Sequence, residues 1–253
     1  MSPPAAGTLR VIDSWLSPDG ADGVPEAHAR RFARSCAALL DTEEDQVRAW
    51  LIDAARAVPA AGRWFPRAEA WTVTGEDCAE VLLHLNLRPA PDRPPGARLH
   101  TIDAPDPRTE PRHKGPDLDL LAELRTEADQ HRAGDAVLVD ADGMVLETDH
   151  SALVWWRGDV LCVPHPELPH LPSVTVERLV AAADEHGVAV RPERARPVDL
   201  AGCEVWALNT LRGIDIVVGW TGSHGDIELA TRPGRAETWQ RRLDARPLAA
   251  GAP

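Results

Sequence analysis

Hydrophobic and polar residues alternate or recur at helical spacing through the first ninety residues. Alternation predicts strands, and apolar positions three and four apart predict amphipathic helices. A Ser-Pro-Asp-Gly turn at 17–20 separates the first strand from the first helix. The segments predicted are a strand at 8–16, helices at 25–40 and 44–58, and strands at 71–73 and 81–87. This first half is therefore expected to be an α+β unit.

The second half shows short apolar runs between two helical segments. Asp142-Gly143 and Gly158-Asp159 have the residue types of tight hairpin turns, which join antiparallel strands. The segments predicted are helices at 117–131 and 174–186 and strands at 136–139, 144–147, 153–156, 160–163, 188–190, 205–208 and 214–220. A short helical stretch is expected after residue 234.

Prolines crowd the segment between residues 89 and 116. Proline lacks a backbone N–H and fixes its own φ, so we expect neither a helix nor a central strand there. The segment is interpreted as an ordered crossing between two domains. The domains expected are 1–103, a crossing at 104–113, and 114–253.

Composition narrows the classes of partner. A formal net charge of −13 argues against binding to a phosphate backbone, and no apolar stretch is long enough to cross a membrane. The first residues do not have the pattern of a secretory signal, which favours a cytoplasmic protein. The widely spaced Cys36, Cys78, Cys162 and Cys203 are expected to be reduced thiols, and no metal site is predicted.

Lys114 is the only lysine in the chain, so the other 26 of the 27 Lys and Arg residues are arginines. An arginine stays protonated, whereas a lysine amine can lose its proton and attack a carbonyl. Any chemistry that needs an amine nucleophile therefore has one candidate. The alternative from composition alone is a solvated cation in a loop.

Four features follow one another at a recognisable spacing. Lys114 precedes a predicted helix, Glu147 ends the run 140–147, and the motifs Leu-Pro-Ser-Val-Thr at 171–175 and Asn-Thr-Leu-Arg-Gly at 209–213 come later. Together they resemble the class IV, or fold-type IV, pyridoxal-phosphate enzymes over roughly residues 8–225. That family includes branched-chain and D-amino-acid aminotransferases and aminodeoxychorismate lyase.

The resemblance implies an α/β protein of the α+β two-domain type. It would have a small N-terminal α+β domain and a larger C-terminal pseudo-barrel domain that binds the cofactor. The chain starts near the third strand of the family pattern, so the small domain is expected to be shortened. Relatives place the active site near a dimer interface, which implies a homodimer.

The resemblance also assigns roles around pyridoxal 5'-phosphate. Lys114 would form the Schiff base with the cofactor and then move the proton at the substrate α-carbon. Glu147 would face the ring nitrogen, although it could instead be a surface carboxylate at a strand end. Arg31, within a His-x-x-Arg-x-x-x-Ser pattern beginning at His28, would reach the phosphate.

Further cofactor contacts are expected at a helix start. Free N–H groups and the helix dipole favour an anion there, so Ser173, Val174 and Thr175 are candidate phosphate ligands. Ser173 could equally serve only as a helix cap. Thr210, with its neighbour Asn209, matches the second phosphate contact of the family. Leu171 matches the residue that packs on the cofactor ring, with a core position as the alternative.

Arg88 and Arg212 are the candidates for binding a substrate carboxylate, or else structural ion pairs. The expected activity is transamination at an amino-acid α-carbon. The alternatives are elimination from aminodeoxychorismate to give p-aminobenzoate and pyruvate, or a family member without catalytic activity. The substrate would be a small amino acid or an aminochorismate-like compound.

Overall fold

The computed structural model describes residues 7–19, 23–74, 79–92 and 95–245. Their contacts group them into two compact units. The first unit takes the described residues up to Asp92 together with His113–Pro116. The second takes the described residues of Arg93–Arg112 and Asp117–Arg246. The domain boundaries expected from the sequence, at residues 103 and 114, stay a prediction.

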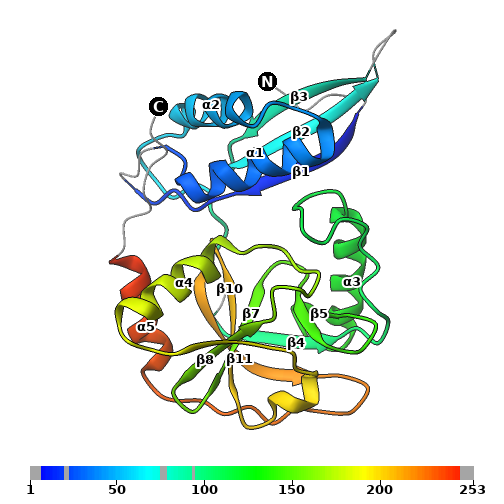
Figure 1. The fold of residues 1–253 in the computed structure, drawn as a ribbon, viewed down its shortest axis with the longest axis vertical. Helices are drawn as coiled ribbons and strands as arrows, with labels where there is room; N and C mark the ends of the chain where they lie inside the picture. The colour runs from blue at the N-terminus through cyan, green and yellow to red at the C-terminus, as the bar shows by residue number, and fades with distance from the viewer. Residues whose placement is uncertain (1–6, 20–22, 75–78, 93–94, 246–253) are drawn as a thin grey trace. The chain divides into compact units, whose positions relative to one another are not determined.

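The first unit is a three-stranded antiparallel sheet with helices on one face (Figure 1). The strands are β1 (Thr8–Ser14), β2 (Arg67–Thr74) and β3 (Ala79–Asn86), in that spatial order. The helices are α1 (Glu26–Leu40) and α2 (Glu44–Ala54), and the 3-10 turn η1 (Ala55–Ala57) extends α2. The predicted helices are confirmed, while β2 begins four residues before the expected strand.

Alternation along the strands separates an apolar face from a polar one. Val11 and Ala70 are fully buried in the cluster that also contains Phe32 and Leu51 of the two helices. The residues between them on the strands point to the other face, where Glu69 of β2 lies opposite Ile12 of β1. The early part of β2 was missed because charged residues alternate with small alanines there.

The second unit is built on a curled sheet of eight strands, in the order β6-β5-β4-β11-β10-β7-β8-β9. The strands are β4 (Ala97–Thr101), β5 (Asp135–Val139), β6 (Val145–Thr148), β7 (Ala152–Arg157), β8 (Val160–Pro164), β9 (Val190–Glu193), β10 (Glu204–Asn209) and β11 (Gly213–Thr221). The helices are α3 (Leu118–Gln130), α4 (Val174–Glu185) and α5 (Arg235–Asp244), with the 3-10 turn η2 (Pro197–Leu200).

β4 corrects the prediction that residues 89–116 hold no central strand. It pairs in parallel with both β5 and β11, so it lies inside the sheet. The prolines stop at Pro95 and resume at Pro105, and the apolar Leu99 and Ile102 between them are buried. The backbone N–H groups that β4 needs to pair with its neighbouring strands are therefore all present, because a proline removes only its own N–H.

Both faces of the large sheet are covered. Trp155 and Trp156 are neighbours on β7, and they belong to different hydrophobic clusters because successive side chains of a strand point to opposite faces. α4 and α5 cover the face of Trp156, where Leu179 and Trp239 are buried.

None of the helices formed by the described residues combines the length and apolarity needed to cross a bilayer. Cys36, Cys162 and Cys203 are buried free thiols, as expected, whereas Cys78 lies outside the described residues. Burial raises the pKa of the Cys36 thiol to about 12, so this thiol stays protonated.

Candidate functional site

The main chain at Lys114 is fixed against β1 within the first unit. The carbonyl oxygen of Lys114 accepts a hydrogen bond from the N–H of Ile12 at 2.7 Å. Gly115 is buried with φ at +133°, and a Cβ there would lie 2.7 Å from the Ile12 nitrogen. Only glycine allows this approach, so the partly buried lysine has a defined origin for its side chain.

A buried carboxylate lies one residue after this contact. Asp13 has no exposed surface, and its oxygens accept hydrogen bonds from Nε and Nη2 of Arg31 at 2.7 and 2.8 Å. Nδ1 of His28 lies 2.7 Å from the same carboxylate. His28 and Arg31 are three residues apart on α1, which places them on the same side of the helix. Asp13 thus holds both side chains.

These contacts determine the charges around Lys114. Burial raises the pKa of Asp13, but the positive charge of Arg31 and the hydrogen bonds outweigh it and hold the pKa well below its ordinary value. Burial lowers the pKa of His28, and the charges of Arg31 and Lys114 add to that shift. A lysine amine and an oriented guanidinium therefore lie near the same buried histidine, and groups of these two kinds can bind an anion.

Glu147 is buried in the second unit, beside a residue pair that the sequence did not indicate. Oε1 of Glu147 accepts hydrogen bonds from Nη1 of Arg108 at 2.8 Å and from the N–H of Leu171 at 2.8 Å. Arg108 also binds Asp106 through Nε and Nη2, at 2.8 to 3.0 Å. Oε2 of Glu147 has no hydrogen-bond partner among the described residues.

In this second cluster Asp106 and Glu147 both contact Arg108. Burial raises the pKa of Glu147, and the charge of Arg108, the N–H of Leu171 and the charge of His170 offset only part of that shift. A cationic N–H beside Glu147 would favour its ionised form. The cluster is therefore suited to a protonated ring nitrogen.

The start of α4 follows Leu171, the residue whose N–H binds Glu147. Ser173 is the N-cap, and its hydroxyl accepts a hydrogen bond from the N–H of Val176 at 3.3 Å, so the predicted capping role is confirmed. Val174 and Thr175 are buried in the first turn, where helix N–H groups have no acceptor within the helix. Two N–H donors at a helix start can bind a phosphate without excluding the cap.

Asn209 shapes the turn that follows β10. Its side-chain oxygen accepts hydrogen bonds from the N–H groups of Leu211 and Arg212 at 3.1 and 3.0 Å, and its amide donates to Ser151 at 2.9 Å. Thr210 is held inside that turn. Arg212 is ion-paired with Asp215, which favours the structural alternative for this arginine.

Arg88 lies on the polar face of the small sheet and has neutral partners. It donates to the carbonyl oxygen of Phe65 at 3.2 Å and to the hydroxyl of Ser14 at 3.3 Å, and it stacks over the Phe65 ring. Burial lowers the pKa of Arg88, and the nearby charge of Arg67 adds to the shift. Because Glu69 is already paired with Arg67, Arg88 lacks a carboxylate of its own among the described residues.

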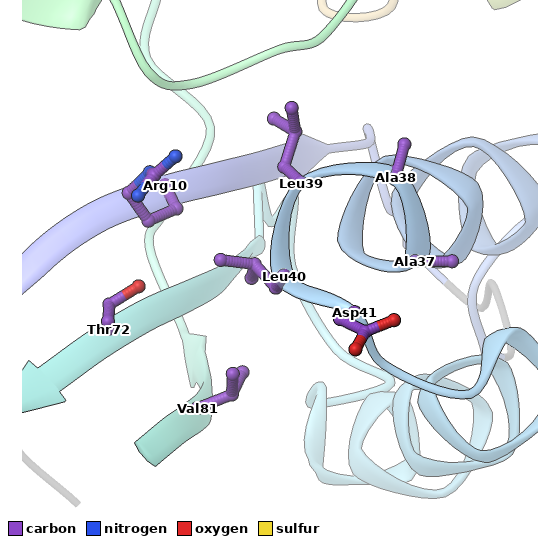
Figure 2. Close-up of a pocket in the computed structure, with 8 residues that line it drawn as sticks. All are labelled: Arg10, Ala37, Ala38, Leu39, Leu40, Asp41, Thr72 and Val81. Atoms are coloured by element: carbon purple, nitrogen blue, oxygen red, sulfur yellow. The ribbon is translucent and has the colours of Figure 1, made fainter. Parts of the chain in front are cut away.

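Two further features lie apart from these clusters. A hollow of about 370 Å³ lies at the end of α1 (Figure 2). It contains none of the predicted site residues and is lined by Arg10, Ala37, Ala38, Leu39, Leu40, Asp41, Thr72 and Val81. Its lining offers one cation, Arg10, the carboxylate of Asp41 and the hydroxyl of Thr72, and it contains no amine, thiol or imidazole.

Asp135, Asp149 and His150 have ligand atoms within 4.8 Å of one another, as a metal site would require. Arg125 of α3 already binds Asp149 at 2.7 Å and lies 2.7 Å from Nδ1 of His150. A guanidinium in that position supplies the positive charge, so the group is an ion-pair network. The expected absence of a metal site stays a prediction.

The predicted residues are thus divided between the units. Lys114, Arg31 and Arg88 belong to the first unit, and the remaining candidates, Glu147, Leu171, Ser173, Val174, Thr175, Asn209, Thr210 and Arg212, belong to the second. Asp13, Asp106 and Arg108 were not predicted from the sequence. Of these three residues, only Asp13 could have been predicted, because side chains alternate along β1 and Asp13 falls on the face that the helices cover.

Each unit, taken by itself, offers groups that pyridoxal phosphate can use. The first unit offers a lysine amine and an oriented guanidinium, and the second offers a buried carboxylate held by Arg108. The open oxygen of Glu147 and the N–H groups at the start of α4 are the observations that make this fit specific.

Comparison with known proteins gives an independent result. Residues 24–220 match the family model described as amino-transferase class IV. No curated protein matches the chain. Solved structures of similar fold are numerous, and three of them indicate the range of proteins that share it.

The first is a hypothetical aminotransferase from Mycobacterium tuberculosis in a PLP-bound form, with a TM-score of 0.78 at 22% identity, covering 95% of this chain and 88% of the other. A Legionella pneumophila protein described as a 4-amino-4-deoxychorismate lyase has a TM-score of 0.79 at 16% identity, with coverages of 97% and 96%. A branched-chain aminotransferase from Thermoproteus uzoniensis, solved with norvaline, has a TM-score of 0.76 at 16% identity, with coverages of 92% and 85%.

Proposed function

The chain belongs to the class IV aminotransferase family, and we propose that it is a pyridoxal-phosphate enzyme that transfers the amino group of an amino acid, with Lys114 as the covalent anchor. The family match includes the only lysine of the chain. The observation that carries the proposal is the buried Glu147, which has one oxygen bound by Arg108 and Leu171 and the other open.

The bound cofactor would supply an aldehyde for amine exchange and an electron-withdrawing ring. Lys114 would be the residue joined to that aldehyde, and once released it would hold the proton that leaves and returns to the substrate α-carbon. Glu147 would face the ring nitrogen, and Arg108 holds Glu147 in place. Leu171, whose N–H binds Glu147, is positioned by the same contact.

Phosphate binding would come from Arg31 and from the start of α4. Arg31 supplies charge, while Val174 and Thr175 supply N–H donors beside the capping Ser173. Asn209 shapes the tight turn that contains Thr210, and the hydroxyl of Thr210 would be a further donor. For the substrate carboxylate, Arg88 is favoured over Arg212 because Arg212 is already paired with Asp215.

An absorbance spectrum tests the proposal. Purified protein incubated with pyridoxal phosphate should show a visible band that borohydride bleaches, and mass spectrometry should find the reduced adduct on the peptide that contains Lys114. Lys114→Ala should show neither. A wild-type protein that stays colourless and unlabelled would contradict the proposal and favour a family member without catalytic activity.

Elimination from aminodeoxychorismate is the second candidate. One observation favours it: the offset of 33 residues between Lys114 and Glu147, which is similar to that of the lyase branch. Pyruvate released from aminodeoxychorismate without a keto-acid acceptor would select the lyase. Amino transfer that requires such an acceptor would select the aminotransferase.

We also propose that the enzyme is a cytoplasmic homodimer. Free buried thiols are compatible with a reducing compartment, and the dimer follows from the resemblance to the family. Light scattering on purified protein tests the dimer, and a monomer at micromolar concentration would contradict it.

A further inference from the structure

Asp13 has the geometry of a residue that orients a guanidinium. Arg31 donates to it through Nε and Nη2, at 2.7 and 2.8 Å, so the two groups form a bidentate pair. Two parallel hydrogen bonds prevent a planar guanidinium from turning about its last bond. The pair therefore fixes the plane and direction of the Arg31 side chain.

A second contact makes Asp13 itself rigid. Nδ1 of His28 lies 2.7 Å from its Oδ1, and the carboxylate has no exposed surface. An ionised carboxylate only accepts, so the proton of neutral His28 is on Nδ1. The preceding residue on β1, Ile12, binds the carbonyl oxygen of Lys114. Adjacent residues of one strand thus hold both the lysine and the arginine.

We propose that Asp13 is a positioning residue for the cofactor, one that holds Arg31 in the direction from which its guanidinium meets the phosphate while Lys114 meets the aldehyde. The inference rests on the proposed function. The proposed role of Asp13 is to make the protein bind a phosphorylated aldehyde more tightly than the same aldehyde without its phosphate. Asp13 contacts neither group of the cofactor and acts through Arg31.

A charge effect and a positioning effect of Asp13 have opposite signs. As a negative charge, Asp13 would repel a phosphate, and Asp13→Asn would tighten binding. As a positioning residue, Asp13 strengthens the contact between Arg31 and the phosphate, and Asp13→Asn weakens it. The substitution keeps the shape of the side chain, so the sign of the change decides between the two.

The experiment measures the dissociation constants of pyridoxal phosphate and pyridoxal for the full chain by equilibrium dialysis. We expect Asp13→Asn to lower the preference for the phosphorylated form by about ten-fold or more, as for one lost charge-assisted contact. Glu26→Gln is the matched control, because Glu26 forms a bidentate pair with Arg48 at 2.9 and 2.8 Å on the same helix layer. An unchanged or increased preference in Asp13→Asn overturns the proposal.

Arg31→Lys keeps the test decisive if Asp13→Asn does not fold. Lysine retains the charge and loses the planar fork that Asp13 orients. Loss of the phosphate preference in Arg31→Lys supports the proposal, and a wild-type preference overturns it. Borohydride trapping of the same samples reports separately on the covalent role of Lys114, so a wild-type protein that prefers the phosphate without being trapped contradicts only the proposed function.

Discussion

The carbonyl oxygen of Lys114 accepts a hydrogen bond from the N–H of Ile12, although the two residues lie far apart in the sequence. The contact joins the segment 113–116 to β1, the strand that also carries Asp13. His113 adds a side-chain contact at 3.1 Å from the hydroxyl of Ser35 on α1. The origin of the lysine side chain is thus fixed by the small sheet and its first helix.

Gly115→Ala should disturb this segment more than a comparable glycine substitution elsewhere. A Cβ at Gly115 would lie 2.7 Å from the Ile12 nitrogen, and the φ of +133° is strained for other residues. We expect a loss of unfolding free energy of about 2 kcal/mol or more, from backbone strain together with overpacking. Urea denaturation of the cofactor-free protein measures it.

Gly23→Ala is the matched control for that measurement. Gly23 also has a positive φ, of +70°, but nothing lies within 4 Å of the position its Cβ would take. It should therefore report backbone strain alone, about 1 kcal/mol. Equal losses in the two variants would show that the close approach to β1 is unimportant.

Whether a site residue could be predicted from the sequence depends on whether its role shows in composition or in a local pattern. Lys114 and Glu147 could be found because one is unique in the chain and the other ends an apolar run at a family-like offset. Arg108 could not be distinguished, because it is one of 26 arginines and lies among prolines. Its role depends on a contact with Glu147, 39 residues later, which no local pattern encodes.

The fold shows the same limit. Helices with a continuous apolar face, such as α1 and α4, were predicted nearly to the residue. β4 was missed because the density of prolines was applied to a whole segment, although residues 97–101 contain none. Where helical or alternating periodicity was strong the prediction held, and where pairing between distant strands decides, as for β4 with β11, it did not.

Arg88→Gln should weaken the binding of carboxylate ligands. Arg88 is partly buried and has only neutral acceptors and the Phe65 ring among its contacts, so a ligand carboxylate would be its charged partner. We expect the dissociation constant of a 2-oxo acid to rise about 10- to 100-fold, as for a lost hydrogen bond between charged groups. Isothermal titration of the cofactor-loaded protein measures it.

The control for Arg88→Gln is Arg63→Gln, which removes the same charge from an exposed side chain near Asp92. If both variants bind the 2-oxo acid as wild type does, Arg88 is structural and the carboxylate binds elsewhere. Visible absorbance should be unchanged in both, because neither arginine takes part in the covalent link.

Acid should destabilise the first unit through Asp13. The pKa of Asp13 is held below its ordinary value of 3.8, so the folded state retains the charge that the unfolded chain loses. Its contribution to stability is present above that value and disappears as the pH falls through the lower, folded pKa. Asp13→Asn should remove this part of the acid sensitivity, as measured by urea denaturation in steps from pH 6 downward.

Glu147→Gln should change stability in the opposite sense with pH. Burial raises the pKa of Glu147 above its ordinary value of 4.5, so its contribution is present below that value and is lost as the pH rises through the folded pKa. In the cofactor-free protein we therefore expect Glu147→Gln to be more stable than wild type at pH 8 and not at pH 4. Arg108 keeps Asp106 as its partner in the variant, so no cation is left unpaired.

The cofactor should reverse that order. A protonated ring nitrogen beside the ionised Glu147 supplies the missing positive charge, so binding should stabilise wild type more than Glu147→Gln at pH 8. Thermal melts with and without pyridoxal phosphate measure this difference, and Glu167→Gln, which removes an exposed carboxylate of the same unit, is the control. An equal gain in wild type and Glu147→Gln would mean that the buried carboxylate does not face the ring.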